Sequence, residues 1–200
     1  YQTLRPPKSW RPSDTPPPKK ASGRVRLAHL LDEHAEEEPL VDLVVFDEAH
    51  YMRNPESSVH RLGEMLQKVS QQRVLLSATP INLHNDDLFH LLQLCDPEHF
   101  QYPSSFQELL LANQPLVSAR DAALNPSSSA EEILTYVKWA ADTDLLRNSR
   151  QLATLLEVPP TDEDLARPAF RAELAASLER INLLGHVITR TRKRDVQMER

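Results

Sequence analysis

The chain has 200 residues, of which 40% are hydrophobic and 26% charged, and its formal net charge is −6. A chain of this length and composition can bury one hydrophobic core of ordinary size. The single cysteine, Cys95, excludes an internal disulfide, which suits a reducing compartment. No apolar run approaches the roughly 18 residues of a membrane span, so we expect a cytoplasmic protein with no membrane partner.

Positive charge gathers at the two ends of the chain. Residues 1–26 contain seven Lys and Arg against one Asp, together with six prolines, and residues 190–200 contain five Lys and Arg against two acids. Nucleic acid would therefore meet basic ends rather than a basic body. For the first segment we prefer a solvated, Pro-rich stretch over a nucleic-acid contact, because aromatic residues are scarce there.

A short helix from Arg26 to Glu37 is the first regular element that the pattern predicts. The apolar run at residues 41–46 follows, and its β-branched residues predict a buried parallel strand. It leads directly into Asp47-Glu48-Ala49-His50. Ligands of open α/β sheets lie at the carboxyl ends of the strands, so we expect both carboxylates in a ligand site. The alternative is a strand that ends in a solvated acidic turn.

The next segments predict a helix at residues 56–70 and a second strand at residues 73–77. A strand, a helix and a strand in this order place the two strand ends side by side. The second strand ends in Ser77-Ala78-Thr79-Pro80. We therefore expect the hydroxyl groups of Ser77 and Thr79 to bond to the acidic motif, with His50 as the contact.

Helical signals dominate the rest of the chain. A helix is predicted from Asp86 to Leu94, and helices and loops from Pro97 to Ala169. A last helix, from Phe170 to Ile188, runs into the basic tail. No metal-ligand spacing of His or Cys appears, so we expect no metal site built from such ligands, and the seven histidines other than His50 are expected at the surface or partly packed.

The motifs Asp47-Glu48-Ala49-His50 and Ser77-Ala78-Thr79-Pro80 resemble motifs II and III of superfamily 2 helicases. The tail from Ile188 to Val196 is similar to the R-x-K-x-D-V segment that closes the first RecA-like lobe of Swi2/Snf2 ATPases. Residues 91–100 resemble bacterial members of the RNA-polymerase-associated type and the Swi2/Snf2 component of DISARM phage-defence systems. Residues 1–4, Tyr-Gln-Thr-Leu, resemble the family's T-Y-x-x-L segment.

This resemblance implies an α/β fold, namely a partial RecA-like lobe of parallel strands and flanking helices with a helical insertion. Residues 1–40 would form the Pro-rich basic segment and short helix, and residues 41–96 the RecA-like core with motifs II and III. Residues 97–200 would form the helical insertion and a basic linker towards a second lobe. The implied function is ATP-dependent translocation on double-stranded DNA, with RNA polymerase or phage-defence proteins as further partners.

The resemblance also assigns roles to single residues. ATP and Mg²⁺ are the implied cofactors, with Asp47 holding Mg²⁺ through water and Glu48 activating the attacking water. His50, Ser77 and Thr79 would couple the nucleotide site to DNA. Four basic residues of the tail would form the hinge to the second lobe: Arg190, Arg192, Lys193 and Arg194. A solvated helix end whose cations complement the helix dipole is the second option, and a direct phosphate contact the third.

None of the three glycines forms the G-x-x-x-x-G-K-[ST] loop that wraps nucleotide phosphates. We therefore expect the chain to be part of a longer ATPase and to be inactive alone. Two alternatives stay open: a non-catalytic scaffold that docks partners through the helical insertion, and a fragment of a D-E-A-H RNA helicase. The basic tail argues against the RNA helicase.

Overall fold

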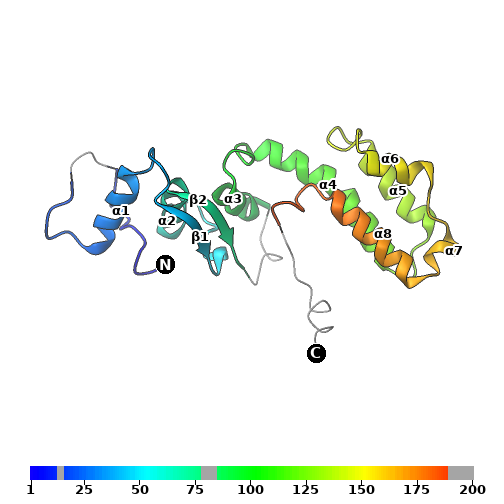
Figure 1. Cartoon of the computed structure of the whole chain (residues 1–200), viewed down its shortest axis with the longest axis horizontal. Coiled ribbons are helices and arrows are strands. Elements are labelled where there is room, and N and C mark those ends of the chain that lie inside the picture. Colours follow the sequence, from blue (N-terminus) through cyan, green and yellow to red (C-terminus); the bar gives the residue numbers. More distant parts are fainter. Residues whose placement is uncertain (13–15, 78–84, 189–200) are drawn as a thin grey trace, which may run out of the picture. The chain divides into compact units, whose positions relative to one another are not determined.

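The computed structural model describes residues 1–12, 16–77 and 85–188, which divide into two compact units, Tyr1–Pro103 and Ser104–Arg200 (Figure 1). The three functional segments expected at 1–40, 41–96 and 97–200 remain an interpretation, since the compact units do not follow those boundaries. Residues 1–40 lie in the same unit as residues 41–96.

The first unit combines helices with a two-stranded sheet. Its elements are α1 (Gly23–Glu33), β1 (Val41–Phe46), the 3₁₀ turn η1 (Ala49–Met52), α2 (Ser58–Lys68), β2 (Ser70–Leu75) and α3 (Asn85–Cys95). The order β1, α2, β2 is the predicted strand–helix–strand unit. The predicted bounds of β1 agree with the structure, and those of α2 and α3 differ by two residues or fewer at each end.

The two strands pair in parallel, as predicted, with Val41 opposite Ser70 and Phe46 opposite Leu75. Strand β2 begins three residues before the expected start at Arg73, because the ladder extends along the whole length of β1. Helix α2 correspondingly ends at Lys68 rather than at residue 70. Hydrophobic pattern alone missed this start, since Ser70, Gln71 and Gln72 are polar.

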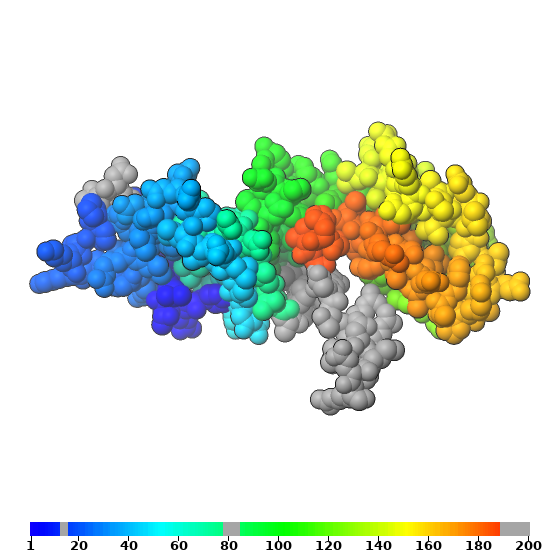
Figure 2. Space-filling model, in the orientation of Figure 1, coloured from blue at the N-terminus to red at the C-terminus, as the bar shows by residue number. Residues whose placement is uncertain are grey.

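The expectation of a strand buried on both faces is wrong for β1 within the described residues. One face, with Val44 and Phe46, packs against α2 and α3. The other face is open to solvent: Leu43 is 49% exposed and Val45 51% exposed. Residues of both strands, cyan to blue-green, reach the surface shown in Figure 2.

Helix α2 lies close to the turn that follows β1. A Cβ atom added at Gly63 would come within 3.1 Å of Leu94 in α3 and 3.3 Å of Met52 in η1. Glycine therefore permits this approach. The helix also begins at a defined point, because the Ser57 hydroxyl accepts a hydrogen bond from the His60 amide.

The second unit is helical throughout its described residues. It contains α4 (Pro103–Leu124), α5 (Ala130–Ala141), α6 (Arg150–Glu157), α7 (Asp162–Leu165) and α8 (Pro168–Ile181). The core packs α4, α5 and α8 together through small and branched side chains, including Ala119, Ile133, Val137 and Leu178. No described helix of the chain has the length and apolar character needed to cross a membrane.

Two helices of this unit differ from expectation. Helix α4 runs through Pro115, which sequence reasoning did not read as the interior of a helix. Helix α8 ends at Ile181 rather than Ile188, because side-chain amides capture the next main-chain groups. The Asn113 side chain accepts from the Leu183 amide at 3.0 Å, and the Asn182 side chain accepts from the Leu184 amide at 2.9 Å.

Candidate functional site

The acidic motif begins where the two strands end. Beyond the ladder, the Leu76 amide donates to the Phe46 carbonyl and the Ala49 amide donates to the Leu76 carbonyl, both at 2.8 Å. Leu76 therefore holds the chain on each side of Asp47 and Glu48. Side chains that follow both strands are brought to one edge, as the sequence predicted.

Glu48 forms a sharp corner at this edge. Its backbone has φ 49 and ψ 46, in the left-handed region that residues other than glycine seldom adopt. Such a conformation costs on the order of 1–3 kcal/mol, and it recurs at functional sites. The Glu48 amide donates to Asp47 Oδ1 at 2.9 Å. Both carboxyl-bearing residues are exposed, so they are accessible to a ligand.

His50 lies between the acidic corner and the end of β2. Its Nδ1 is 3.2 Å from Glu48 Oε2 and 3.5 Å from Ser77 Oγ. The expected contact between His50 and Ser77 is therefore present in the structure. One ring nitrogen can donate to the carboxylate or accept from the hydroxyl, but not both in one tautomer. The imidazole therefore lies between the Glu48 carboxylate and the Ser77 hydroxyl.

Tyr1 belongs to this site, although sequence reasoning gave it no role. Its phenol donates a hydrogen bond to the Asp47 carbonyl, across 46 positions of sequence. Burial raises the pKa of the Tyr1 phenol, and the negative charges of Asp47 and Glu48 raise it further. The likeness of residues 1–4 to the T-Y-x-x-L segment was the only sequence signal for this contact.

His60 supports the far end of the motif from helix α2. It is buried, contrary to the expectation of a surface or partly packed side chain. Its Nδ1 lies 2.6 Å from the Met52 carbonyl at the end of η1. The turn that carries the motif is therefore tied to α2 by a side chain as well as by packing.

Several expected site residues lie outside the described residues. They are Thr79 of the second motif and the basic tail residues Arg190, Arg192, Lys193 and Arg194. Their coupling, hinge and nucleic-acid roles stay predictions.

Comparison with known proteins now identifies the family. The SNF2-related domain matches residues 27–198, which is most of the chain. The chain belongs to the SNF2-related domain family. This confirms the expected Swi2/Snf2-type relationship, and the family as a whole is a class of helicase-like ATPases.

Among curated proteins, this SNF2-related chain is similar to RNA polymerase-associated proteins RapA. It is 27% identical over 159 residues to RapA of Haemophilus influenzae strain Rd, covering 78% of the chain and 17% of that protein. It is 32% identical over 131 residues to RapA of Stutzerimonas stutzeri, covering 58% and 14%. The chain thus spans about a sixth of the length of these curated relatives. No solved structure matches it significantly.

Membership of the SNF2 family implies a nucleotide and Mg²⁺, and the donor chemistry at the strand ends fits the metal. Mg²⁺ prefers oxygen ligands, keeps several waters and uses one or two carboxylates. Asp47 and Glu48 supply two exposed carboxylates at one corner. No group of three or more His, Cys, Asp and Glu that could hold a metal ion occurs within the described ranges.

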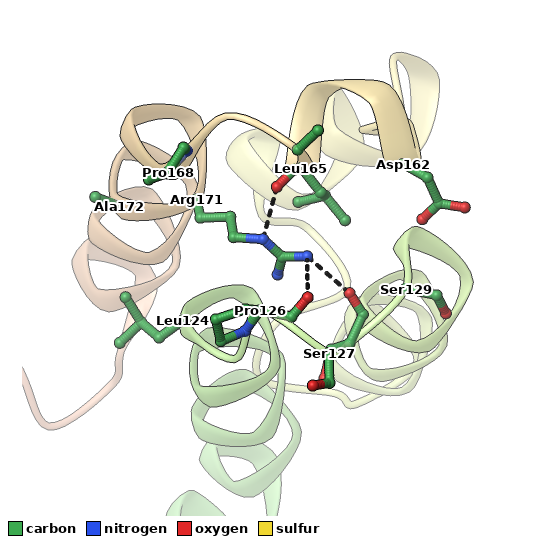
Figure 3. Close-up of a pocket in the computed structure, with 11 residues that line it drawn as sticks. Leu124, Pro126, Ser127, Ser129, Asp162, Leu165, Pro168, Arg171 and Ala172 are labelled. Atoms are coloured by element: carbon green, nitrogen blue, oxygen red, sulfur yellow. Dashed lines mark hydrogen bonds between the residues drawn. The ribbon is translucent and has the colours of Figure 1, made fainter.

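The second unit of this SNF2 domain contains a cavity of about 540 Å³. Figure 3 shows Arg171 reaching across it from α8. The guanidinium donates to main-chain carbonyls of the α4 end, the following loop and α7, at residues 122, 123, 125, 126, 128 and 165. Asp162 in turn accepts from the Ala130 amide at 2.7 Å. These groups hold the unit together, so the strand ends remain the better candidate site.

Proposed function

We propose that this chain is the part of a first RecA-like lobe that positions Mg²⁺ and the attacking water in an ATP-dependent, double-stranded-DNA-translocating SNF2 protein. One observation carries the proposal: Asp47 and Glu48 form an exposed corner that parallel strand ends hold on both sides, with His50 and Ser77 beside it. The mixed helix and strand fold, with its parallel pair, is compatible with such a lobe.

Within this proposal each carboxylate has a separate task. Asp47 would hold Mg²⁺ through its bound waters, and the metal supplies charge neutralisation of the phosphates. Glu48 would orient the attacking water and accept its proton, since its side chain is half exposed and points to the site that His50 flanks. In this proposal the G-x-x-x-x-G-K-[ST] loop, which these 200 residues lack, would be supplied by another part of a longer polypeptide.

Glu48→Gln in the longest natural polypeptide that contains this sequence tests the catalytic assignment. The amide keeps the shape of the side chain but cannot take a proton, so kcat should fall by at least about 100-fold while KM for ATP changes little. Glu56→Gln, an exposed glutamate after the same turn, is the matched control and should keep wild-type turnover. Normal turnover by Glu48→Gln would refute the assignment. If the wild-type polypeptide has no ATPase turnover, the alternative of a non-catalytic scaffold is favoured.

Ser77 is proposed to couple nucleotide state to DNA through His50. Ser77→Ala should leave most of the ATPase activity and reduce translocation on duplex DNA by a larger factor, because the hydroxyl contacts His50 rather than the reacting phosphate. An ATPase assay and a triplex-displacement assay on the same preparation separate the two effects. Equal losses in both assays would show that the strand end is only structural.

RNA polymerase is a proposed partner, because the RapA relatives carry that association in their names. We also propose a cytoplasmic location on this basis. Copurification with the longer polypeptide tests the choice of partner. Recovery of RNA polymerase would support the proposal, and recovery of phage-defence proteins in its place would contradict it. The match to the SNF2-related domain supports a DNA-dependent enzyme over the RNA-helicase alternative.

A further inference from the structure

The Asp47–Glu48 peptide is the link of the acidic corner that Leu76, the residue after β2, does not hold. Leu76 bonds to the chain before it, at Phe46, and after it, at Ala49. The carbonyl oxygen of this peptide instead accepts from the phenol of Tyr1. A side chain outside the strand–helix–strand unit therefore sets the orientation of the peptide plane.

Rotation of this peptide plane would change ψ of Asp47 and φ of Glu48 together. Because φ of Glu48 is 49, a half-turn would carry the residue out of the left-handed region. This flip would break the bond from the Glu48 amide to Asp47 Oδ1 and withdraw the Asp47 carbonyl from the phenol. It would leave both Cα atoms nearly in place and release the Asp47 carboxylate, which this amide bond orients.

Tyr1 is itself well anchored against such a movement. Its carbonyl accepts from the amides of Leu4 at 3.1 Å and Arg5 at 2.9 Å. Its ring packs against two buried clusters, which contain Leu62 of α2 and Phe46 of β1. The phenol therefore acts as a fixed donor rather than a mobile surface group.

We propose that Tyr1 is a positioning residue of the ATPase site, whose phenol locks the Asp47–Glu48 peptide in the orientation in which the Glu48 amide holds the Asp47 carboxylate. The catalytic part of this inference rests on the proposed function. The conformational part does not, because it concerns only the peptide plane.

The conformational part is tested on the 200-residue chain itself. Tyr1→Phe keeps the ring and removes the donor, so hydrogen exchange of the Glu48 amide should become about tenfold faster. Labelling with ¹⁵N-glutamate makes this amide visible by NMR, and a Glu48→Gln sample assigns its signal. In the same spectrum, the Glu132 amide bonded to Ser129 Oγ and the α2 amide of Glu64 are controls and should keep their rates.

Each outcome is decisive. An unchanged Glu48 rate overturns the lock, and equal acceleration at Glu64 shows that Tyr1 only stabilises the unit, which also overturns it. In the longer polypeptide, Tyr1→Phe should lower kcat about tenfold and raise the Mg²⁺ concentration needed for half-maximal turnover, whereas Tyr102→Phe, at an exposed tyrosine, should match wild type. If Glu48→Gln abolishes turnover but Tyr1→Phe does not change it, the positioning role fails and the proposed function stands. If the wild-type protein has no turnover, the proposed function fails, while the exchange result still decides the lock.

Discussion

At the scale of single residues, the site depends on main-chain geometry as much as on side-chain identity. The pair Asp47 and Glu48 is visible in the sequence, and so is the expectation that His50 meets Ser77. The left-handed corner at Glu48 is not, because glutamate has no preference for positive φ. The sequence gives no sign of the His60 bond and only the T-Y-x-x-L likeness for the Tyr1 bond, since in both cases the acceptor is a backbone carbonyl, which every residue carries.

Cys95 allows a prediction of pH dependence. Burial raises the pKa of its thiol, and nearby Asp96 raises it too, against the lowering effect of Arg73. The thiolate is the reactive form, so a raised pKa leaves less of it at a given pH. Alkylation by iodoacetamide at neutral pH should be slower than for a free thiol, and its rate should keep rising above pH about 8.5, the ordinary pKa of a cysteine thiol. Mass spectrometry measures the rate. In the urea-unfolded chain, Cys95 should be alkylated as fast as a free thiol. An equally slow rate in the unfolded chain would contradict the explanation by burial.

At the scale of elements, side chains that bond to the main chain decide where helices end. Predicted positions of α2 and α3 follow from apolar spacing and are close to those observed, whereas α1 (Gly23–Glu33) begins three residues before and ends four residues before the predicted helix from Arg26 to Glu37. The end of α8 at Ile181 depends on Asn113, 70 positions away from the amide it accepts. Helix α4 continues through Pro115, where local propensity predicts a break. Such long-range contacts override the local pattern.

Arg171 is the element-scale feature whose loss should cost most in the second unit. Lysine has three donors in place of the planar fork of five, so Arg171→Lys should leave carbonyls at the end of α4 unpaired. We expect a loss of about 2 kcal/mol in the free energy of unfolding, and thus a fall in the unfolding midpoint on the order of 10 °C. Arg180→Lys is the control, since Arg180 bonds only to a carbonyl of its own helix in the contacts described. Thermal melting by circular dichroism compares them, and equal midpoints would show that the Arg171 bonds contribute little.

At the scale of the whole molecule, the open face of the sheet is the feature that most departs from expectation. Val41, Leu43 and Val45 on β1 lie on the same face as Val74 on β2, and all are at least 41% exposed. A contiguous apolar patch of this kind is usual where another surface packs. Within the described residues this face stays open to solvent.

An open apolar face should make the isolated chain bind hydrophobic dyes. The double variant Leu43→Gln with Val74→Gln should reduce fluorescence of bound ANS by about half or more and lessen self-association, because it removes the centre of the patch. Val158→Gln alters a single residue of the second unit that is 75% exposed. This control should change neither the ANS fluorescence nor the self-association. Dye titration and sedimentation velocity provide the measurements. Unchanged dye binding in the double variant would place the binding surface elsewhere.

The sequence by itself determined the family, the strand–helix–strand order and the acidic pair at the strand end. These follow from local periodicity and from motifs that are contiguous in the chain. Tertiary structure decided the backbone corner at Glu48, the Tyr1 bond to the Asp47 carbonyl and the open face of β1. The physical reason is that each of these features depends on which distant groups come into contact. Local sequence does not predict which backbone carbonyl accepts a bond or which face of a strand stays uncovered.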